Sequence, residues 1–380
     1  MSVRTTLVAA TALALSAALA GPALAAPAGR APAAPAAGHP AARKAIEAAV
    51  ESGVPGATAT VRDTRGTWSA TAGVGDTRTG APRSPSDRYR AGSITKTFVA
   101  TVLLQLEAEG RLSLDDTVDK WLPGVVSGHG NDGRRITVRQ LLNHTSGIFN
   151  YTADDDFGRT YFTKDGFFEH RYDTLTPAGL VAIAMKHPPA FAPGTSWAYS
   201  NTNYVLAGMV IKAVTGHSYA KEITDRVIRP LHLTGTSLPG TRTTLPRPSS
   251  RAYSKLTDPT GPTYDVTALN PSMASSAGEL ISTSADLTRF YEALLRGRLL
   301  PPHQLKEMKT TTPMPGDPNG AYGLGLMDVT LPCGVHVWGH DGGIHGSSSV
   351  AATTPEGGRG RGRPVDPHSA GVLEGEWGGG

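Results

Sequence analysis

The residue types best suited to chemistry stand in the stretch Gly92-Ser93-Ile94-Thr95-Lys96, where a lysine follows a serine after three residues. The apolar run that begins at Phe98 recurs at i, i+3 and i+4, which predicts a helix with one buried stripe. Ser93 and Lys96 then lie one turn apart on one helix face, with Ser93 at the N-terminus, where the dipole favours developing negative charge. A serine hydroxyl becomes a nucleophile when a neighbouring base takes its proton. A buried lysine can be that base, because desolvation lowers its pKa.

A structural interpretation of the same pattern is available. Ser93 can be a helix cap and Lys96 a solvated residue of the first turn. Ser218-Tyr219-Ala220-Lys221 has the same spacing, so the pattern alone is not specific. Two further motifs decide between the alternatives.

The second motif is Tyr199-Ser200-Asn201, just before an apolar helical pattern that begins at Asn203. A tyrosine phenol can shuttle protons if a nearby cation lowers its pKa. An asparagine amide can hold a substrate carbonyl. The alternative is a turn in which Asn201 caps the helix.

The third motif is His340-Asp341-Gly342-Gly343, which follows an alternating segment typical of a strand. A cation beside a glycine on an edge strand lets an extended substrate approach the backbone. The rival Lys164-Asp165-Gly166 lies in a polar loop without a strand around it.

His340 can also be a structural histidine. A metal site with His345 is not supported, since no set of Cys, Asp or Glu with ligand spacing accompanies the pair.

The first residues are typical of a targeting segment. Arg4 precedes the apolar run Leu7 to Leu19, and Ala23-Leu24-Ala25 offers a cleavage site. We therefore expect a signal peptide over residues 1–25, a flexible leader over 26–40 and an exported protein. The apolar run is too short for a membrane span and no cysteine lies near the cleavage site, so no stable membrane anchor is expected.

Composition narrows the partners. The chain has 380 residues, 39% of them hydrophobic, and a formal charge of +4. Its arginines are scattered apart from three in the tail, so nucleic acid is not indicated. The length after the leader suits one large domain or two intimate ones.

Helical and strand patterns divide the chain. Strands are expected near both ends and helices between them, which predicts an α/β fold of the α+β type with an antiparallel sheet built from both termini. We expect the catalytic domain over residues 41–357, with its helical part at about 97–290. The individual expectations are helices at 41–51, 93–110, 137–142, 176–186, 203–215 and 284–296, and strands at 56–63, 67–73, 322–330, 334–338 and 347–352.

The three motifs in this order resemble the penicillin-recognising serine hydrolases. The sequence segments that flank the motifs are similar to those of exported actinobacterial D-alanyl-D-alanine carboxypeptidases, which use His in the third motif. These segments are residues 98–110, 136–147, 193–216, 277–283 and 322–326. The resemblance runs from about residue 54 to about residue 355. It implies a beta-lactamase/transpeptidase-like fold with the active site in the crevice between the helical domain and the sheet.

The resemblance also implies a role for each residue. Ser93 would form an acyl-enzyme, and Lys96 and Tyr199 would form the proton network, with either as the base. Asn201 would bind the substrate amide, and His340 with Gly342 would line the site and keep positive charge near Tyr199. The oxyanion hole would be the N–H groups of Ser93 and Gly343. No metal or cofactor is implied, and the expected partners are peptidoglycan stem peptides and β-lactams.

Three positions depart from the carboxypeptidases. Hydroxyl residues stand there in place of Asp341 and Gly343, and an arginine stands about where this chain has Met327. Methionine cannot replace a bidentate arginine–carboxylate contact. Three hypotheses therefore remain: a D-alanyl-D-alanine carboxypeptidase, a related esterase, D-aminopeptidase or β-lactamase-like hydrolase that needs no substrate carboxylate, and an inactive or truncated family member.

The end of the chain differs from the resembling proteins, in which one more strand and a closing helix follow. After Gly357 the sequence has dense glycine and no strand or helix period over residues 358–380. In the resembling proteins a cysteine near Cys333 pairs with one near the C-terminus, and this chain has no second cysteine. We expect a disordered tail that results from a frameshift or truncation and leaves a sheet edge exposed.

Overall fold

The computed structural model describes residues 38–355. The signal peptide, most of the leader and the tail expected at 358–380 lie outside the described residues.

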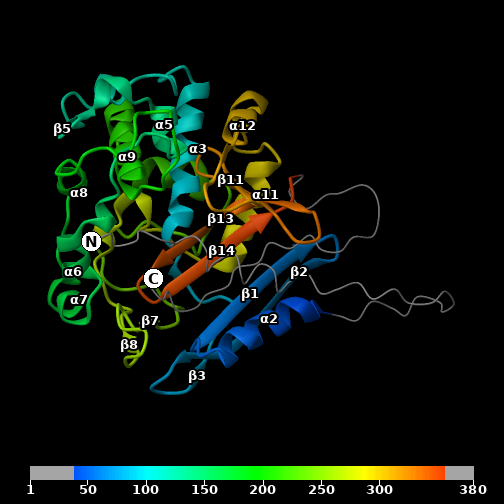
Figure 1. Cartoon of the computed structure of the whole chain (residues 1–380). Coiled ribbons are helices and arrows are strands. Elements are labelled where there is room, and N and C mark those ends of the chain that lie inside the picture. The colour runs from blue at the N-terminus through cyan, green and yellow to red at the C-terminus, as the bar shows by residue number, and fades with distance from the viewer. Residues whose placement is uncertain (1–37, 356–380) are drawn as a thin grey trace.

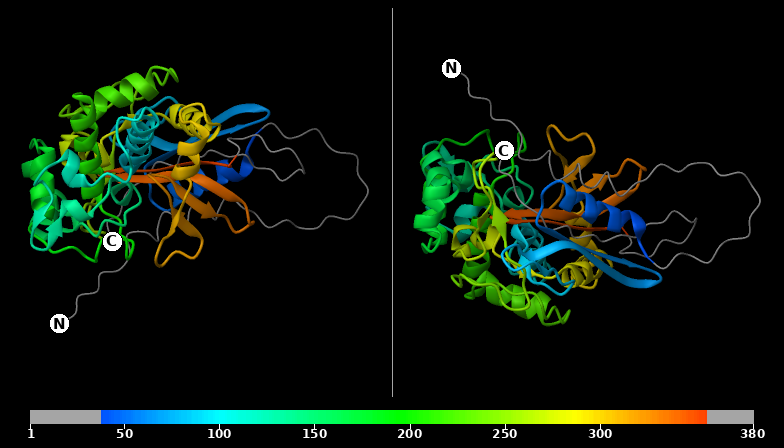
Figure 2. Two further views of the ribbon diagram at one scale, coloured as in Figure 1. Left: turned by 90° about the horizontal axis from the view of Figure 1, so that it is seen from above. Right: turned by 90° about the horizontal axis from the view of Figure 1, so that it is seen from below.

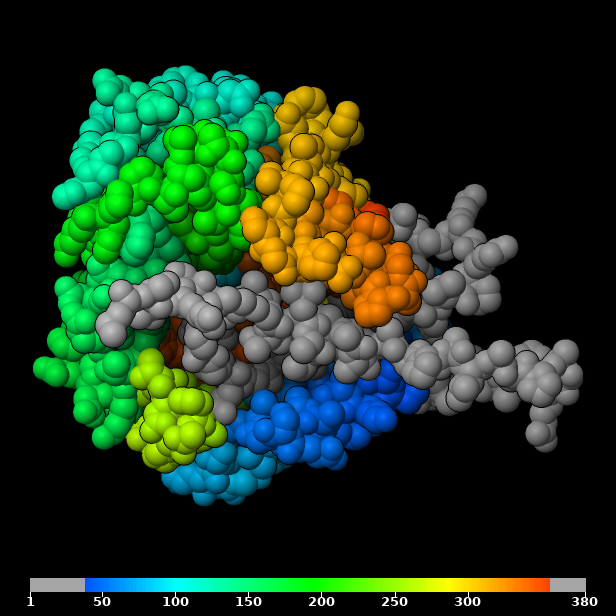
Figure 3. Space-filling model, in the orientation of Figure 1, coloured from blue at the N-terminus to red at the C-terminus, as the bar shows by residue number. Residues whose placement is uncertain are grey.

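Most helices gather on one side of the described residues, whereas the helices Pro40–Glu51 and Ser284–Leu295 pack against strands (Figures 1 and 2). The space-filling view shows the cyan and green residues of the helical side together, with the orange strand residues on the opposite side (Figure 3). The helices are α2 (Pro40–Glu51), α3 (Thr95–Ala108), α4 (Val118–Trp121), α5 (Val138–Leu142), α6 (Asp155–Tyr161), α7 (Lys164–His170), α8 (Pro177–Ala184), α9 (Asn201–Thr215), α10 (Tyr219–Ile223), α11 (Ser284–Leu295) and α12 (Pro302–Met308).

The strands form antiparallel sheets. One sheet has five strands in the order β10 (Thr312–Pro313), β11 (Gly320–Tyr322), β12 (Met327–Thr330), β13 (His336–Ile344) and β14 (Ser347–Thr353). Another has the order β1 (Gly56–Asp63), β2 (Gly66–Asp76) and β3 (Ala81–Pro82). Three short pairs complete the set: β4 (Tyr89–Arg90) with β9 (Ile281–Ser282), β5 (Ser127–Gly128) with β6 (Asn131–Asp132), and β7 (Tyr253–Ser254) with β8 (Tyr264–Asp265).

The mixed helix and sheet class with antiparallel strands is confirmed, but the strands of the two ends do not share one sheet among the described residues. β1 is hydrogen-bonded to β2, and β14 to β13, so each is an edge strand of its own sheet. Helix α11 packs against both β1 and β14 and so joins the two sheets (Figure 1).

Three local expectations differ from the structure. The strand expected at 322–330 is two strands, because Gly325 turns the backbone between them with φ +67°. The strand expected to end at 338 continues to Ile344, so the third motif lies inside β13 rather than after it. Lys164 to Gly166, expected in a loop, begins α7, where the Thr163 side chain accepts a hydrogen bond from the Gly166 backbone N–H.

Helix α3 is buried more completely than its sequence predicts. Its residues from Thr95 to Leu104 are all buried, rather than one stripe of them. The reason is its central place, with contacts to α9, α10 and α12. A helix covered on most sides holds its first turn, and therefore Lys96, in a fixed position.

A buried carboxyl lies in the segment that follows the short 3₁₀ turn η7 (Ser275–Ala277). Glu279 is 1% exposed, and its two oxygens accept hydrogen bonds from the Tyr219 hydroxyl at 2.7 Å and the Gly240 backbone N–H at 2.9 Å. Burial raises the pKa of Glu279 to about 7, against the smaller opposing effects of these hydrogen bonds and of Arg90.

The first prediction concerns stability against pH. The pKa of Glu279 rises on folding from 4.5 to about 7, so the folded state binds its proton more tightly. Its contribution to the free energy of unfolding is therefore fully present below pH 4.5 and decreases as pH rises toward 7. In Glu279→Gln the amide oxygen accepts from the Gly240 N–H and the amide N–H donates to the Tyr219 hydroxyl oxygen, as a protonated carboxyl would. Without a charge to bury, the variant should be more stable than the wild type by about 2–3 kcal/mol at pH 8, with little difference at pH 4.5.

Urea unfolding at the two pH values measures this difference. Glu307→Gln, a change at a partly exposed carboxyl paired with Arg139, serves as the control and should keep the wild-type pH dependence. An equal effect of Glu279→Gln at both pH values would contradict the assignment.

Candidate active site

Ser93 lies in the 3₁₀ turn η2 (Gly92–Ile94), which runs directly into α3. Gly92 has φ +52°, and a side chain there would come within 2.7 Å of the backbone nitrogen of Gly343. Glycine is therefore required for η2 to approach β13 so closely. This approach fixes the nucleophile candidate against the third motif.

Lys96 is fully buried one turn after Ser93. Its Nζ lies 2.9 Å from Ser93 Oγ, 2.8 Å from Asn201 Oδ1 and 2.8 Å from the carbonyl oxygen of Ala277. Desolvation holds the pKa of Lys96 well below its ordinary value, although the charge of Asp341 acts in the opposite direction. The sequence-based expectation of a lysine with a lowered pKa next to Ser93 agrees with this geometry.

The same three contacts suit a neutral amine. An ammonium has three donors, whereas a neutral amine has two and a lone pair. The neutral form keeps its two hydrogen bonds to Asn201 and Ala277, while the Ser93 hydroxyl donates to Nζ. Lys96 is thus oriented to accept the Ser93 proton.

The Tyr199 phenol hydrogen-bonds with Ser93. Lys96 Nζ is 4.8 Å from the centroid of the Tyr199 ring. The condition for proton transfer by Tyr199, a pKa lowered by a nearby cation, is not met. Burial raises that pKa well above its ordinary value, and the negative charge of Asp341 adds to the effect. Of the two base candidates, the electrostatics therefore favour Lys96.

Asn201 is the first residue of α9. Besides its contact with Lys96, its Nδ2 donates to the Thr152 hydroxyl at 3.3 Å, and its backbone N–H donates to Asn150 Oδ1 at 3.0 Å. The side chain therefore orients Lys96, while the second proton on Nδ2 is available to a substrate carbonyl.

His340 is buried in β13, and its hydrogen bonds are with residues other than Tyr199, its expected neighbour. Its Nε2 lies 2.8 Å from the Tyr322 hydroxyl, and its Nδ1 lies 2.5 Å from the Asp341 carbonyl oxygen and 3.3 Å from Asp341 Oδ1. The Tyr322 ring in turn contacts the ring of Tyr199 at 6.4 Å between centroids. The Tyr322 side chain therefore contacts both His340 and Tyr199.

The two glycines of the third motif lie against η2. A side chain on Gly342 would come within 2.0 Å of the Ala91 carbonyl oxygen and 3.0 Å of the Ser93 backbone nitrogen. With the close approach of Gly343 to Gly92, this contact brings together the Ser93 and Gly343 backbones expected to form the oxyanion hole.

His144 is a site residue to which sequence reasoning assigned no role. It is fully buried, its ring centroid is 4.4 Å from that of Tyr199 and 4.8 Å from that of Tyr322, and its Nδ1 accepts the Ser200 backbone N–H at 3.2 Å. Burial, then the charges of Lys96 and His340, hold its pKa well below the ordinary value. His144 is a neutral support for the Tyr199 ring. The sequence feature that could have identified it as a site residue is its position in the segment Asn143-His144-Thr145-Ser146-Gly147.

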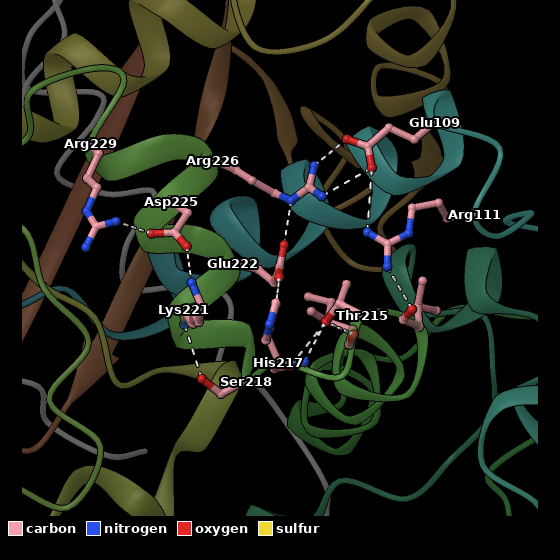
Figure 4. Close-up of polar contacts among 12 residues, drawn as sticks. Glu109, Arg111, Thr215, His217, Ser218, Lys221, Glu222, Asp225, Arg226 and Arg229 are labelled. Carbon is pink, nitrogen blue, oxygen red and sulfur yellow. Dashed lines mark hydrogen bonds and ion pairs between the residues drawn. The ribbon is translucent and has the colours of Figure 1, made fainter.

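The rival serine–lysine pair has a structural role (Figure 4). The Ser218 hydroxyl accepts a hydrogen bond from the Lys221 backbone N–H at 3.2 Å and so caps α10. Lys221 Nζ points to Asp225, with which it forms an ion pair. This pair therefore has the capping arrangement that was the alternative for Ser93.

The described residues offer neither a metal site nor a membrane-spanning helix. In residues 38–355, no three or more His, Cys, Asp or Glu side chains are grouped so that they could hold a metal ion. His345 Nε2 lies 2.7 Å from the Tyr161 carbonyl oxygen instead of facing His340. Within the same residues, no helix has the length and apolar character needed to cross a membrane. Cys333 is an exposed free thiol.

Solved structures provide the first comparison. The chain is 58% identical to a D-stereospecific amidohydrolase from Streptomyces sp., with a TM-score of 0.83 over 89% of this chain and 94% of that chain. It is 28% identical to a D-amino acid amidase from Ochrobactrum anthropi SV3 in complex with L-phenylalanine amide, with a TM-score of 0.75 over 88% of this chain and 90% of that chain.

Proteins of similar sequence provide the second comparison. Protein flp of Staphylococcus aureus is 29% identical over 72% of this chain, and penicillin-binding protein 4* of Bacillus subtilis is 27% identical over 71%. The alignments cover 51% and 58% of those two proteins, so the chain spans little more than half of their length. The profile of the beta-lactamase family matches residues 42–362. Since this match covers most of the chain, the protein belongs to the beta-lactamase family of serine hydrolases.

Proposed function

We propose that the protein hydrolyses amides of D-configured substrates through an acyl-enzyme on Ser93. The observation that carries the proposal is the hydrogen-bonded group of Ser93, Lys96 and Tyr199 at the start of α3. The similarity to the Streptomyces D-stereospecific amidohydrolase over nearly the whole of both chains supports the substrate class.

In the proposed mechanism, Ser93 Oγ attacks the amide carbonyl carbon while its proton passes to Lys96 Nζ. The N–H groups of Ser93 and Gly343 stabilise the oxyanion. The carbon–nitrogen bond then breaks, and the leaving amine receives a proton from the network of Lys96 and Tyr199. Water attacks the ester by the reverse route, which releases the acid and restores Ser93.

The carboxypeptidase expected from the sequence is the second candidate, favoured by the similarity to penicillin-binding protein 4*. Two residues oppose it. Met327 pairs with Gly339 in the ladder between β12 and β13 and offers no hydrogen-bond donor for a terminal carboxylate. Asp341 places a negative charge beside the site, which repels a carboxylate.

The second prediction tests the nucleophile. Ser93→Ala should abolish covalent labelling by a fluorescent penicillin and lower turnover of D-phenylalanine amide by at least about 10³-fold, because no acyl-enzyme can form. Intact-mass spectrometry and amide hydrolysis measure the two effects. Ser218→Ala is the matched control and should change neither. A labelled Ser93→Ala protein would refute the assignment.

The third prediction tests the base. A lowered lysine pKa means that Lys96 is neutral at lower pH than a free lysine, and the rate is lost as pH falls through that pKa. Lys96→Arg keeps its proton at all accessible pH values and should lose about 10²–10⁴-fold in kcat. Tyr199→Phe should lower the rate but retain the acid limb of the kcat profile. Lys96→Arg with wild-type rate and pH profile would exclude this base.

The fourth prediction tests substrate selection. In the double variant Met327→Arg with Asp341→Thr, the arginine supplies a hydrogen-bond donor for the terminal carboxylate of the substrate, and the loss of Asp341 removes a charge that repels this carboxylate. Each hydrogen bond to the charged carboxylate should contribute roughly 1.5–3 kcal/mol to binding. The kcat/KM for a D-Ala-D-Ala peptide should therefore rise relative to that for a neutral p-nitrophenyl ester. Met327→Leu is the uncharged control. If the double variant leaves the ratio of peptide to ester unchanged, the carboxylate is not selected at these positions.

A further inference from the structure

One charged side chain beside the site has no part in the acyl transfer. Asp341 lies between His340 and Gly342 on β13, and Gly342 packs against the backbone of Ser93. The Asp341 side chain is 42% exposed, whereas that of His340 is 0% exposed. The carboxylate of Asp341 is thus the accessible charge of the third motif.

Its contacts leave room for a ligand. One carboxylate oxygen lies 3.3 Å from His340 Nδ1, and the carboxylate also accepts a hydrogen bond from the backbone N–H of Asp341 itself. In residues 38–355 no side chain other than His340 bonds this carboxylate. Other buried acids of the helical side already have their partners: Asp154 pairs with His187 and Glu279 binds Tyr219. An acceptor that is open on one side suits a donor brought by the substrate.

The negative charge is present and acts on the catalytic groups. Burial tends to raise the pKa of Asp341, but the hydrogen bond and charge of His340 and the charge of Lys96 lower it below the ordinary value. In return, Asp341 raises the pKa of Lys96 and that of Tyr199. Its charge therefore favours the protonated form of Lys96, in which the lysine cannot act as a base.

A positive charge on the substrate would remove that effect. An ammonium near Asp341 forms a charge-assisted hydrogen bond with the open oxygen and offsets the carboxylate's effect on Lys96. A free carboxylate at the same place is repelled, and an N-acylated amine offers no charge. The charge of Asp341 reaches Lys96 and Tyr199, the two groups that bond Ser93, so a ligand of its carboxylate lies near the reacting groups.

We propose that Asp341 is a specificity residue that binds the free α-ammonium group of the substrate, so that the enzyme acts at the N-terminal residue of D-amino acid amides or peptides. This assignment rests on the proposed amide hydrolysis at Ser93 and adds the part of the substrate that is recognised.

The test compares D-phenylalanine amide with N-acetyl-D-phenylalanine amide, which differ in the charged amine. Asp341→Asn, which has the same shape without the charge, should lower kcat/KM for the free amine by at least about tenfold, mainly through KM, and change the acetylated substrate little. Asp341→Glu should restore part of the preference, which a purely structural role would not require.

Asp328→Asn is the matched control. Asp328 lies on β12 and forms a similar pair with a histidine, His336 at 3.1 Å, so its change removes a comparable charge from the same sheet. It should leave the preference for the free amine intact. Penicillin labelling of Ser93 in every variant reports whether the site is folded.

The outcomes separate two failures. If the wild type hydrolyses both amides and Asp341→Asn leaves their ratio unchanged, the amine assignment is overturned while the proposed function stands. If the wild type hydrolyses neither amide although penicillin labels Ser93, the amidase function and the amine assignment are both overturned.

Discussion

The buried amine of Lys96 is the constraint on which the site depends. A lysine without solvent needs a hydrogen-bond acceptor for each proton it retains, since an unpaired buried charge is costly. Its hydrogen-bond partners come from three places in the chain: Ser93 in η2, Asn201 at the start of α9 and Ala277 in η7. Asn201 and Ala277 lie 105 and 181 residues after Lys96 in the sequence, so the helical side must be assembled before the amine is satisfied. The tight burial of α3 follows from that requirement.

The parts of the site that sequence could predict are those with local signals. The spacing of Ser93 and Lys96 places them on adjacent turns, and the apolar run after them identifies a helix. The strands 56–63 and 347–352 were also expected where the structure has β1 and β14, give or take one residue, because both patterns are short and well delimited. Local spacing was sufficient wherever the partners lie within one element.

The sequence-based expectations were less accurate where the interacting residues are distant in sequence or where burial sets the pKa of a side chain. β13 continues through the third motif because β14 supplies the ladder from His340 to Ile344, whereas the alternation visible in the sequence stops at Trp338. The pKa of Tyr199 depends on a cover of aromatic rings and on Asp341, neither of which is near Tyr199 in sequence. His144 supports that ring from a turn after α5, where no periodicity indicates its role.

In the proposed mechanism, the side chains of the acyl transfer and those that select the substrate come from different elements. The groups of the proposed acyl transfer, Ser93, Lys96 and Tyr199, belong to η2, α3 and the segment before α9, whereas the two groups that bear on substrate charge, Met327 and Asp341, belong to β12 and β13. A side chain on a strand can change its charge without moving the backbone that meets η2, because that approach is made by Gly342 and Gly343. The sheet can therefore change which charge it favours while the helical side keeps the same nucleophile. This separation gives a physical reason why one fold includes both penicillin-binding proteins and amidases among the relatives of this chain.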